Sequence, residues 1–179
     1  MATSGSTDFE LDVADYIEEA FERCGQEVRT GYDLKTAKRS LNLLFADWAN
    51  RGLNRWTIAQ TSTTLSAGTL EYTLGADTID ILSAVIRTGS GTNQNDTQIS
   101  RISRDVYLNI PNKNIQGRPN QWYVDRQITP KIRLYPTPDT TYTLVYDRLT
   151  RIEDADTFVN TADVPFRFCP CLSAGLAYY

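Results

Sequence analysis

The chain has 179 residues, the size of one ordinary domain with a hydrophobic core of its own. It contains no histidine, and this excludes Ser-His-Asp hydrolysis, Cys-His nucleophilic catalysis and zinc sites with histidine ligands. Its 18 basic and 22 acidic residues give a formal net charge of −4. A sequence-independent DNA binder usually carries the opposite balance, because basic residues must neutralise phosphates. No segment approaches the ~18 consecutive apolar residues of a membrane span, so we expect no membrane association.

A first helix is predicted near the N-terminus. Thr7 and Glu10 have the spacing of a capping box, and apolar residues then recur at helical intervals. Gly25 stands where a C-terminal cap belongs. The outer face of this helix is strongly acidic, since residues 8–27 hold eight carboxylates against Arg23 alone.

A second helix follows after a short connection. Thr30 and Asp33 again have capping-box spacing, and residues 50–52 end the helix with Asn-Arg-Gly. The apolar stripe consists of Leu34, Ala37, Leu41, Leu44, Phe45 and Trp48. The short connection predicts an antiparallel helical hairpin, with Trp48 buried between the helices.

From residue 57 onward the pattern becomes that of strands. Extended or alternating segments occur at residues 57–64, 70–74 and 79–88, and then at 121–127, 131–135 and 142–146. The last three alternate apolar and polar residues between proline-containing turns, which predicts an antiparallel meander. Residues 88–96 are polar and glycine-rich, so they form a hairpin tip or a flexible loop, and Ser103 caps a short helix through Leu108.

A third helix closes the chain. Asp163 and Pro165 are predicted to open it, and its apolar stripe runs from Phe168 to Tyr179. We therefore expect an α+β fold in one domain, residues 1–179. In it the terminal segments, 1–56 and 163–179, form a helical bundle, and residues 57–152 form an inserted antiparallel β meander.

Candidate chemistry is sparse. The carboxylates Glu153, Asp154 and Asp156 are the densest acidic cluster, but Phe158 and Val159 stand where a calcium loop needs a ligand and glycine, which favours a solvated acidic loop. The other carboxylates show no spacing that suggests a paired-carboxylate glycosidase. We expect no catalytic residue, no metal and no cofactor.

Residues 101–133 are locally basic, with seven Lys or Arg against two Asp, and Trp122 and Tyr123 lie among them. Such a segment could bind nucleic acid, could pair with the acidic first helix of a neighbouring copy, or could be a solvated sheet face. For the second alternative the expected subunit-interface residues are Asp15, Glu18, Glu22, Arg118 and Arg126.

Three blocks of the sequence together resemble one family. They are TGYDLKTAKRSLNLLFADWANRGLNRWTI (30–58), GRPNQWYVDRQITPKIRLYPTPDTTYTLVYDRL (117–149) and DVPFRFCPCLSAGLAYY (163–179). In order and spacing they resemble the head–tail adaptor, or connector, proteins of short-tailed bacteriophages, the group that includes tail tubular protein A. Each block alone consists mostly of core and turn residues, and the resemblance rests on their joint occurrence.

This resemblance implies a structural virion protein, made in the host cytoplasm and placed at the portal–tail junction. Members form a ring of identical subunits, typically a dodecamer, which docks under the portal protein, carries the tail nozzle protein and surrounds a channel for DNA. A segment beyond the last helix commonly reaches the portal. Here the chain stops inside that helix, so we expect a continuation or a partner at this end.

Two other functions are open at this stage. A carbohydrate-binding or depolymerising virion module would use Trp56, Trp122 and Tyr123 as exposed stacking platforms. A DNA-binding module would use the basic surface of residues 101–133.

Overall fold

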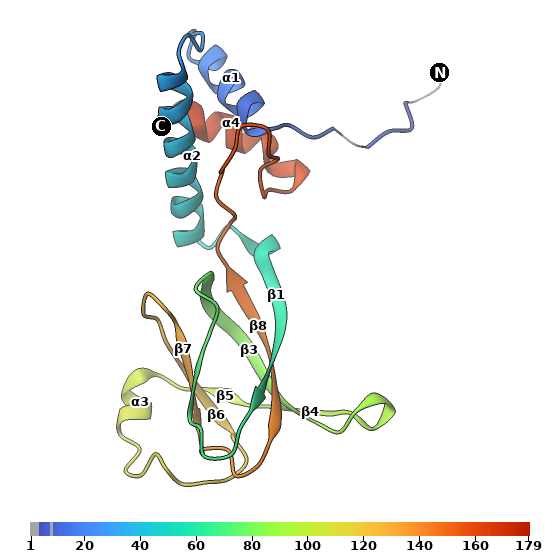
Figure 1. Cartoon of the computed structure of the whole chain (residues 1–179), viewed down its shortest axis with the longest axis vertical. Helices are drawn as coiled ribbons and strands as arrows, with labels where there is room; N and C mark the ends of the chain where they lie inside the picture. The colour runs from blue at the N-terminus through green and yellow to red at the C-terminus, as the bar shows by residue number, and fades with distance from the viewer. Residues whose placement is uncertain (1–3, 8) are drawn as a thin grey trace. The chain divides into compact units, whose positions relative to one another are not determined.

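The computed structural model describes residues 4–7 and 9–179 and has an α+β fold with four α-helices and two largely antiparallel sheets in that part of the chain. The chain divides into two compact units (Figure 1). The helical unit consists of Met1–Trp56 and Ile152–Tyr179, and the β unit consists of Thr57–Arg151. None of the helices in the described ranges is long and apolar enough to cross a membrane.

Helix α1 (Val13–Arg23) begins later than predicted. Its N-terminal cap is Asp12, which exchanges reciprocal hydrogen bonds with Asp15 at 2.9 and 3.1 Å, and not Thr7. The first two helical N–H groups, of Val13 and Ala14, donate to backbone oxygens of the segment at residues 158–160, each over 3.0 Å. A contact distant in sequence therefore fixes the start of the helix, and the local spacing of Thr7 and Glu10 could not reveal it. Asp8 lies outside the described residues.

The predicted cap at Gly25 is confirmed. Its φ of 70° is left-handed, its N–H donates to Glu22 O over 2.9 Å, and the N–H of Gln26 donates to Phe21 O over 2.9 Å. These two bonds form a Schellman motif, which satisfies carbonyls that the helix end leaves without partners. The chain can then turn directly into the next helix.

Helix α2 (Gly31–Asn50) agrees with the prediction at both ends. Thr30 and Asp33 form a capping box at the start. At the other end Gly52 adopts a φ of 68°, and the N–H of Leu53 donates to Trp48 O over 3.1 Å in a second Schellman motif. At both ends the capping donors and acceptors lie within a few residues of each other, so the sequence pattern alone was sufficient to predict them.

Helix α4 (Cys169–Tyr178) also begins later than predicted, after a 3-10 turn, η3 (Phe166–Phe168). The predicted apolar stripe consists of Phe168, Cys171, Leu172, Gly175, Leu176 and Tyr179. It is confirmed at Leu172 and Leu176, which are buried four residues apart on the side of α4 that faces the core, and it is wrong at Cys171 and Tyr179, which are exposed because the buried side is narrower than the predicted stripe.

The helices α1, α2 and α4 share one apolar core centred on Ile17, Leu41 and Leu172. Gly175 lets α4 come close to α2, because a Cβ atom there would lie 3.0 Å from Leu44 Cδ2. The segment between the β unit and η3 is held against α2 as well. The side-chain amide of Asn42 accepts from Ala155 N (2.8 Å) and donates to Ala155 O (3.3 Å).

The β unit contains two four-stranded sheets that share a second apolar core. The first sheet has the order β1-β8-β3-β4, with β1 (Ile58–Leu65), β8 (Tyr142–Thr150), β3 (Thr78–Thr88) and β4 (Asn95–Gln98). The second has the order β2-β7-β6-β5, with β2 (Glu71–Thr73), β7 (Lys131–Tyr135), β6 (Gln121–Asp125) and β5 (Ser100–Arg101). All neighbours are antiparallel except β5 and β6. The short helices are η1 (Arg55–Thr57), η2 (Gly91–Asn93) and α3 (Arg104–Leu108), and Ser103 caps α3 as predicted.

The predicted meander is wrong at its third strand. Strands β6 and β7 form an antiparallel pair, but β8 leaves them and pairs with β1 and β3 in the other sheet. The turn between β7 and β8 is bound elsewhere, because Thr137 N donates to Ile115 O (2.9 Å), Gly117 N donates to Thr137 O (2.9 Å) and Thr137 Oγ1 donates to Lys113 O (3.0 Å). These bonds direct the chain away from β7, and the alternating pattern of β8 suits either sheet.

Of the two alternatives for residues 88–96, the structure has the hairpin tip. Thr88 pairs with Asn95, and Arg87 makes two hydrogen bonds of 2.8 Å to the carboxylate of Asp96. Residues 89–98 are all exposed, as their polar composition indicates. The ion pair and the β3–β4 ladder hold the hairpin without any core residue at its tip.

Trp48 is buried, as predicted, with 8% of its surface exposed. Its ring lies 6.5 Å from Phe45 and 5.9 Å from Phe168, centroid to centroid. We expect Trp48→Ala to lower the free energy of unfolding by about 3–5 kcal/mol, because it leaves a cavity where α2 meets α4. Urea denaturation followed by far-UV circular dichroism measures this. Val159→Ala, a truncation at an exposed position of the same unit, is the control, and equal losses for the two variants would contradict the assignment of Trp48 to the core.

Candidate subunit interface

The carboxylates of the predicted interface form a stripe on α1. Asp15, Glu18 and Glu22 are exposed, at intervals of three and four residues, on the face opposite Val13 and Ile17. Asp15 is engaged in the capping box. Among the described residues, Glu18 and Glu22 have no hydrogen-bond or ion-pair partner, so their charge is available to another molecule.

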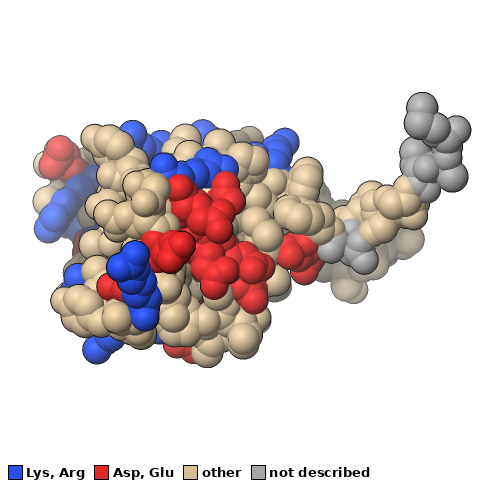
Figure 2. Space-filling model, turned by 90° about the horizontal axis from the view of Figure 1, so that it is seen from above, with Lys and Arg blue, Asp and Glu red and all other residues tan. Residues whose placement is uncertain are grey.

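The surroundings reinforce this negative charge. The nearby Glu19 pairs with Arg23 over 2.7 Å, which consumes the only cation of the helix. Together with the side of α4 at Cys169, Pro170 and Ser173, the α1 carboxylates line a shallow groove of about 470 Å³. In the space-filling view from above, acidic side chains gather in a contiguous patch (Figure 2).

The predicted basic residues lie in the β unit, where most of them already have partners. Arg126 Nη2 lies 2.6 Å from Asp80 Oδ2, and Arg101 binds the same carboxylate at 2.9 and 3.1 Å. Arg118 donates to the hydroxyl of Thr97 over 2.5 Å. The net positive charge of the surface formed by residues 101–133 is thus lower than their sequence indicates, because Asp80 approaches it from β3. The predicted contact of α1 with Arg118 and Arg126 involves two copies of the chain and stays a prediction.

A second carboxylate from outside the basic segment, Glu71 on β2, is shared by two cations of β7. Lys131 Nζ lies 2.6 Å from Glu71 Oε1, and Arg133 Nε lies 2.8 Å from Oε2. The hydrogen bond from Lys131, followed by that from Arg133, lowers the pKa of Glu71 below its ordinary value of 4.5. Cations and carboxylate lie on adjacent strands and bind β2 to β7.

The aromatic residues of the carbohydrate-binding alternative are not platforms. Trp122 is 1% exposed and donates from Nε1 to Ile99 O over 3.1 Å, and Tyr123 is 9% exposed and stacks on Tyr107. The ring of Trp56 packs 4.7 Å from that of Phe168, and its Nε1 donates to Asp163 O. A sugar ring needs an exposed aromatic face for stacking, so this alternative loses the residues on which it was based.

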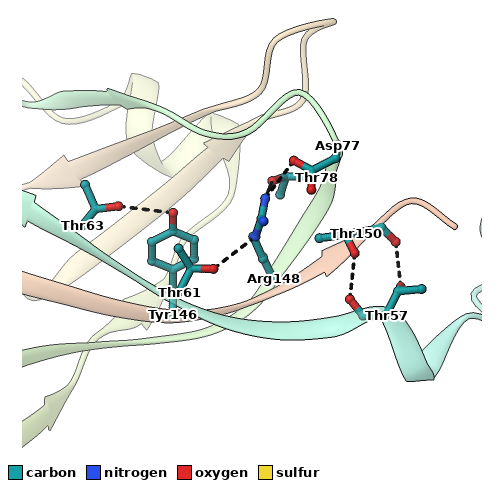
Figure 3. Close-up of polar contacts among 8 residues, drawn as sticks. All are labelled: Thr57, Thr61, Thr63, Asp77, Thr78, Tyr146, Arg148 and Thr150. Atoms are coloured by element: carbon teal, nitrogen blue, oxygen red, sulfur yellow. Dashed lines mark hydrogen bonds and ion pairs between the residues drawn. The ribbon is translucent and has the colours of Figure 1, made fainter. Parts of the chain in front are cut away.

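Sequence reasoning missed a set of polar contacts on β1, β3 and β8 (Figure 3). Thr57 and Thr150 each donate from the hydroxyl to the other's backbone oxygen, at 2.7 and 2.9 Å. The Thr63 hydroxyl lies 3.3 Å from the Tyr146 hydroxyl. The signal that could have revealed this set is the repeated threonine of residues 57–64, which places hydroxyls along one strand.

Arg148 of β8 is the centre of that set (Figure 3). Its guanidinium donates to Thr61 Oγ1 (3.1 Å), Thr78 Oγ1 (3.1 Å) and Asp77 Oδ1 (2.8 Å). The contacts connect the edge strand β1 to β3 across β8. These bonds join side chains of neighbouring strands, so the arrangement stabilises the sheet. In residues 4–7 and 9–179 no three Cys, Asp or Glu side chains converge to hold a metal ion.

The family model of the SU10 adaptor protein matches residues 9–179, which include both units. The chain belongs to this family. The SU10 adaptor proteins are a family of phage head–tail adaptors, so the chain is a structural component of a virion. No curated protein matches the chain significantly.

Family membership confirms the broader part of the resemblance, a phage adaptor. The match is to SU10 adaptors, and it does not support the narrower likeness to tail tubular protein A. An adaptor interacts with other proteins of the portal and tail, so its functional site is a set of protein-binding surfaces.

The close packing of Gly75 gives a test of the Arg148 contacts. A Cβ atom at this position would lie 2.8 Å from Arg148 Nη1 and closer still to Asp77 Oδ1. We expect Gly75→Ala to lower the free energy of unfolding by about 1–3 kcal/mol, because the ion pair must move. Gly31→Ala is the matched control, since a Cβ atom at Gly31 has open space, and it should be neutral or slightly stabilising. Chemical denaturation of both variants decides, and a neutral Gly75→Ala would show that the ion pair does not hold this turn.

Glu71 should make the stability of the chain pH-dependent. Its folded-state pKa is lowered, so its ion pairs contribute stability above the ordinary pKa, and this contribution is lost as the pH falls through the lower, folded-state pKa. The difference in unfolding free energy between wild type and Glu71→Gln should therefore be larger at about pH 7 than at about pH 3. Urea titrations at both pH values measure it, with Glu18→Gln as the control. A difference that is independent of pH would contradict the assignment.

Proposed function

We propose that the chain assembles with copies of itself into a ring that joins the portal protein at the capsid vertex to the tail nozzle protein. The observation that carries this proposal is the match of the phage adaptor family to residues 9–179. The resemblance to connector proteins suggests twelve subunits. The location that follows is the portal–tail junction of the virion, after synthesis in the host cytoplasm.

In this ring α1, α2 and α4 form the helical bundle of the wall. Their common apolar core supports this role, because it fixes the three helices to one another within each subunit before they meet neighbouring subunits. In this proposal the β unit, which lies in the sequence between α2 and the segment that begins at Ile152, is an insertion in a single adaptor domain. A closed ring needs two different, matching faces on every subunit, and an acidic stripe on α1 can serve as one of them.

The ring encloses a channel through which the genome passes. The formal charge of −4 per chain is suited to a conduit, because a negative surface repels phosphate and DNA then moves without adhering. A basic lumen would retain the duplex by releasing counterions. The structural role requires no catalysis, and we expect background rates in hydrolase assays on peptidoglycan, polysaccharide and nucleic acid.

For the second face, the sequence predicts Arg118 and Arg126. The structure leaves both exposed, and Asp80 faces two guanidiniums, so positive charge remains on this surface. If this surface is the second face, charge complementarity with Asp15, Glu18 and Glu22 orients neighbouring subunits, and reversing both arginines abolishes assembly.

Assembly is measured directly by the mass of the particle. We expect the purified chain, alone or mixed with its portal protein, to yield a complex with twelve times the chain mass of 20.2 kDa, visible as a ring by negative-stain electron microscopy. Size-exclusion chromatography with light scattering provides the mass. A chain that stays monomeric at high concentration, and does not bind the portal protein, would contradict the proposed function.

A further inference from the structure

The outward face of α2 carries a stripe of residues that are exposed in the described part of the chain. We call it the α2 stripe, and it consists of Tyr32, Lys35, Arg39, Leu43 and Ala46. The intervals of three and four residues place all five on one side of the helix, opposite the buried Leu41 and Leu44. Tyr32 is 75% exposed and Leu43 is 54% exposed. Tyrosine is enriched at protein interfaces, so the stripe combines apolar contact area with charge.

The two cations of the stripe differ in their contacts from the other cations near them. Among the described residues, Lys35 and Arg39 make no hydrogen bond or ion pair. Neighbouring cations on the same helix differ, since Lys38 donates to Asp156 O over 2.7 Å and Arg51 pairs with Asp47 over 2.9 Å. Of the three cations within α2, Lys38 therefore has a partner among the described residues, whereas Lys35 and Arg39, one turn apart on the α2 stripe, have none.

The acidic stripe of α1 matches this spacing. Glu18 and Glu22 stand four residues apart, as do Lys35 and Arg39, and four helical residues rise by about 6 Å. Both pairs are exposed on faces directed away from the common core, so α1 of one copy can meet α2 of the next without disturbing either core. The contact joins two different faces, which is the heterologous type that a ring requires.

As a partner for the acidic α1 stripe, the α2 stripe would also give up weaker existing interactions than the surface at Arg126. Arg126 would have to exchange or share the carboxylate of Asp80, 2.6 Å away, and a charge-assisted bond of this kind is among the stronger hydrogen bonds. Lys35 and Arg39 give up only contacts with water. Lys35 and Arg39 therefore gain more free energy than Arg126 does from binding the same carboxylates of a neighbouring subunit.

We propose that the α2 stripe binds the acidic α1 stripe of a second copy of this chain, with Lys35 and Arg39 facing Glu18 and Glu22 and with Leu43 and Tyr32 forming the apolar part of the contact. The inference rests on the proposed ring, and it identifies which two faces of the subunit close it.

The test is a charge exchange between two variants. One carries Glu18→Lys and Glu22→Lys, so both its stripes are basic. The other carries Lys35→Glu and Arg39→Glu, so both are acidic. We expect each variant alone to lose assembly, with the apparent dissociation concentration raised at least about tenfold at low salt. An equal mixture should regain a ring in which the two variants alternate, because every contact then joins opposite charges.

The controls separate this inference from the proposed function. Arg118→Glu with Arg126→Glu tests the competing second face in the β unit: this variant assembles like wild type if the α2 stripe closes the ring, and loses assembly if the β unit does. Leu43→Asp should weaken assembly at every salt concentration. All replaced residues are exposed, and unchanged circular dichroism verifies the fold. The wild-type ring should also loosen as salt shortens the Debye length from ~10 Å at 0.1 M to ~3 Å at 1 M.

Other outcomes would overturn the inference. Normal assembly of the Lys35→Glu, Arg39→Glu variant overturns the inference while leaving the ring intact, and a loss of duplex DNA retention by that variant would assign the face to DNA. Loss of assembly in the Arg118→Glu, Arg126→Glu variant alone would identify the β unit as the second face. A wild-type chain that never assembles overturns the ring and the inference together.

Discussion

The pairing of β1 with β8 is the constraint on which the rest of the structure depends. The two strands are far apart in sequence, yet they align without interruption from Ile58 opposite Leu149 to Leu65 opposite Tyr142. The reciprocal bonds of Thr57 and Thr150 close the end of this ladder. The chain therefore leaves the helical unit and returns to it at neighbouring points. This proximity removes most of the loop-closure entropy that would oppose packing α4 on α1 and α2.

The two units use charge in different ways. In the β unit, Asp80, Glu71 and Asp96 each lie within ion-pair distance of arginine or lysine, and these contacts fasten one strand to another. In the helical unit, Glu18 and Glu22 of α1 and Lys35 and Arg39 of α2 lie exposed, with no hydrogen-bond or ion-pair partner among the described residues. Exposed ion pairs contribute only ~0.2–1 kcal/mol each to stability, so leaving these groups unpaired costs the monomer little. These unpaired groups can still attract and orient an oppositely charged partner.

Local patterns were sufficient where the deciding atoms are close in sequence. The capping box at Thr30 and the Schellman motif at Gly25 could both be predicted, because donor and acceptor lie within a few residues. The start of α1 could not, since its first donors bind residues 158–160. The assignment of β8 to the meander failed for a similar reason, because Thr137 binds residues 113–117 and the alternation of a strand does not specify its sheet.

The candidate site shows the same division. The acidic stripe of α1 could be predicted, because its carboxylates repeat along one helix. The basic surface of residues 101–133 was overestimated, because Asp80 and Glu71 approach it from other strands. The α2 stripe was visible as residues outside the apolar pattern, but its importance depends on which cations remain unpaired, and only the folded chain determines that.

The β3–β4 hairpin has a consequence for how this adaptor can change over time. Residues 89–98 are all exposed and contribute nothing to either core. Its geometry depends mainly on the Arg87–Asp96 contact and on the left-handed backbone at Gly89, whose φ is 75°. Substitutions, and even added residues, at the tip leave the packing of the subunit untouched. In a ring the tip is repeated once per subunit, so a short foreign sequence placed there would be displayed in as many copies as the ring has members.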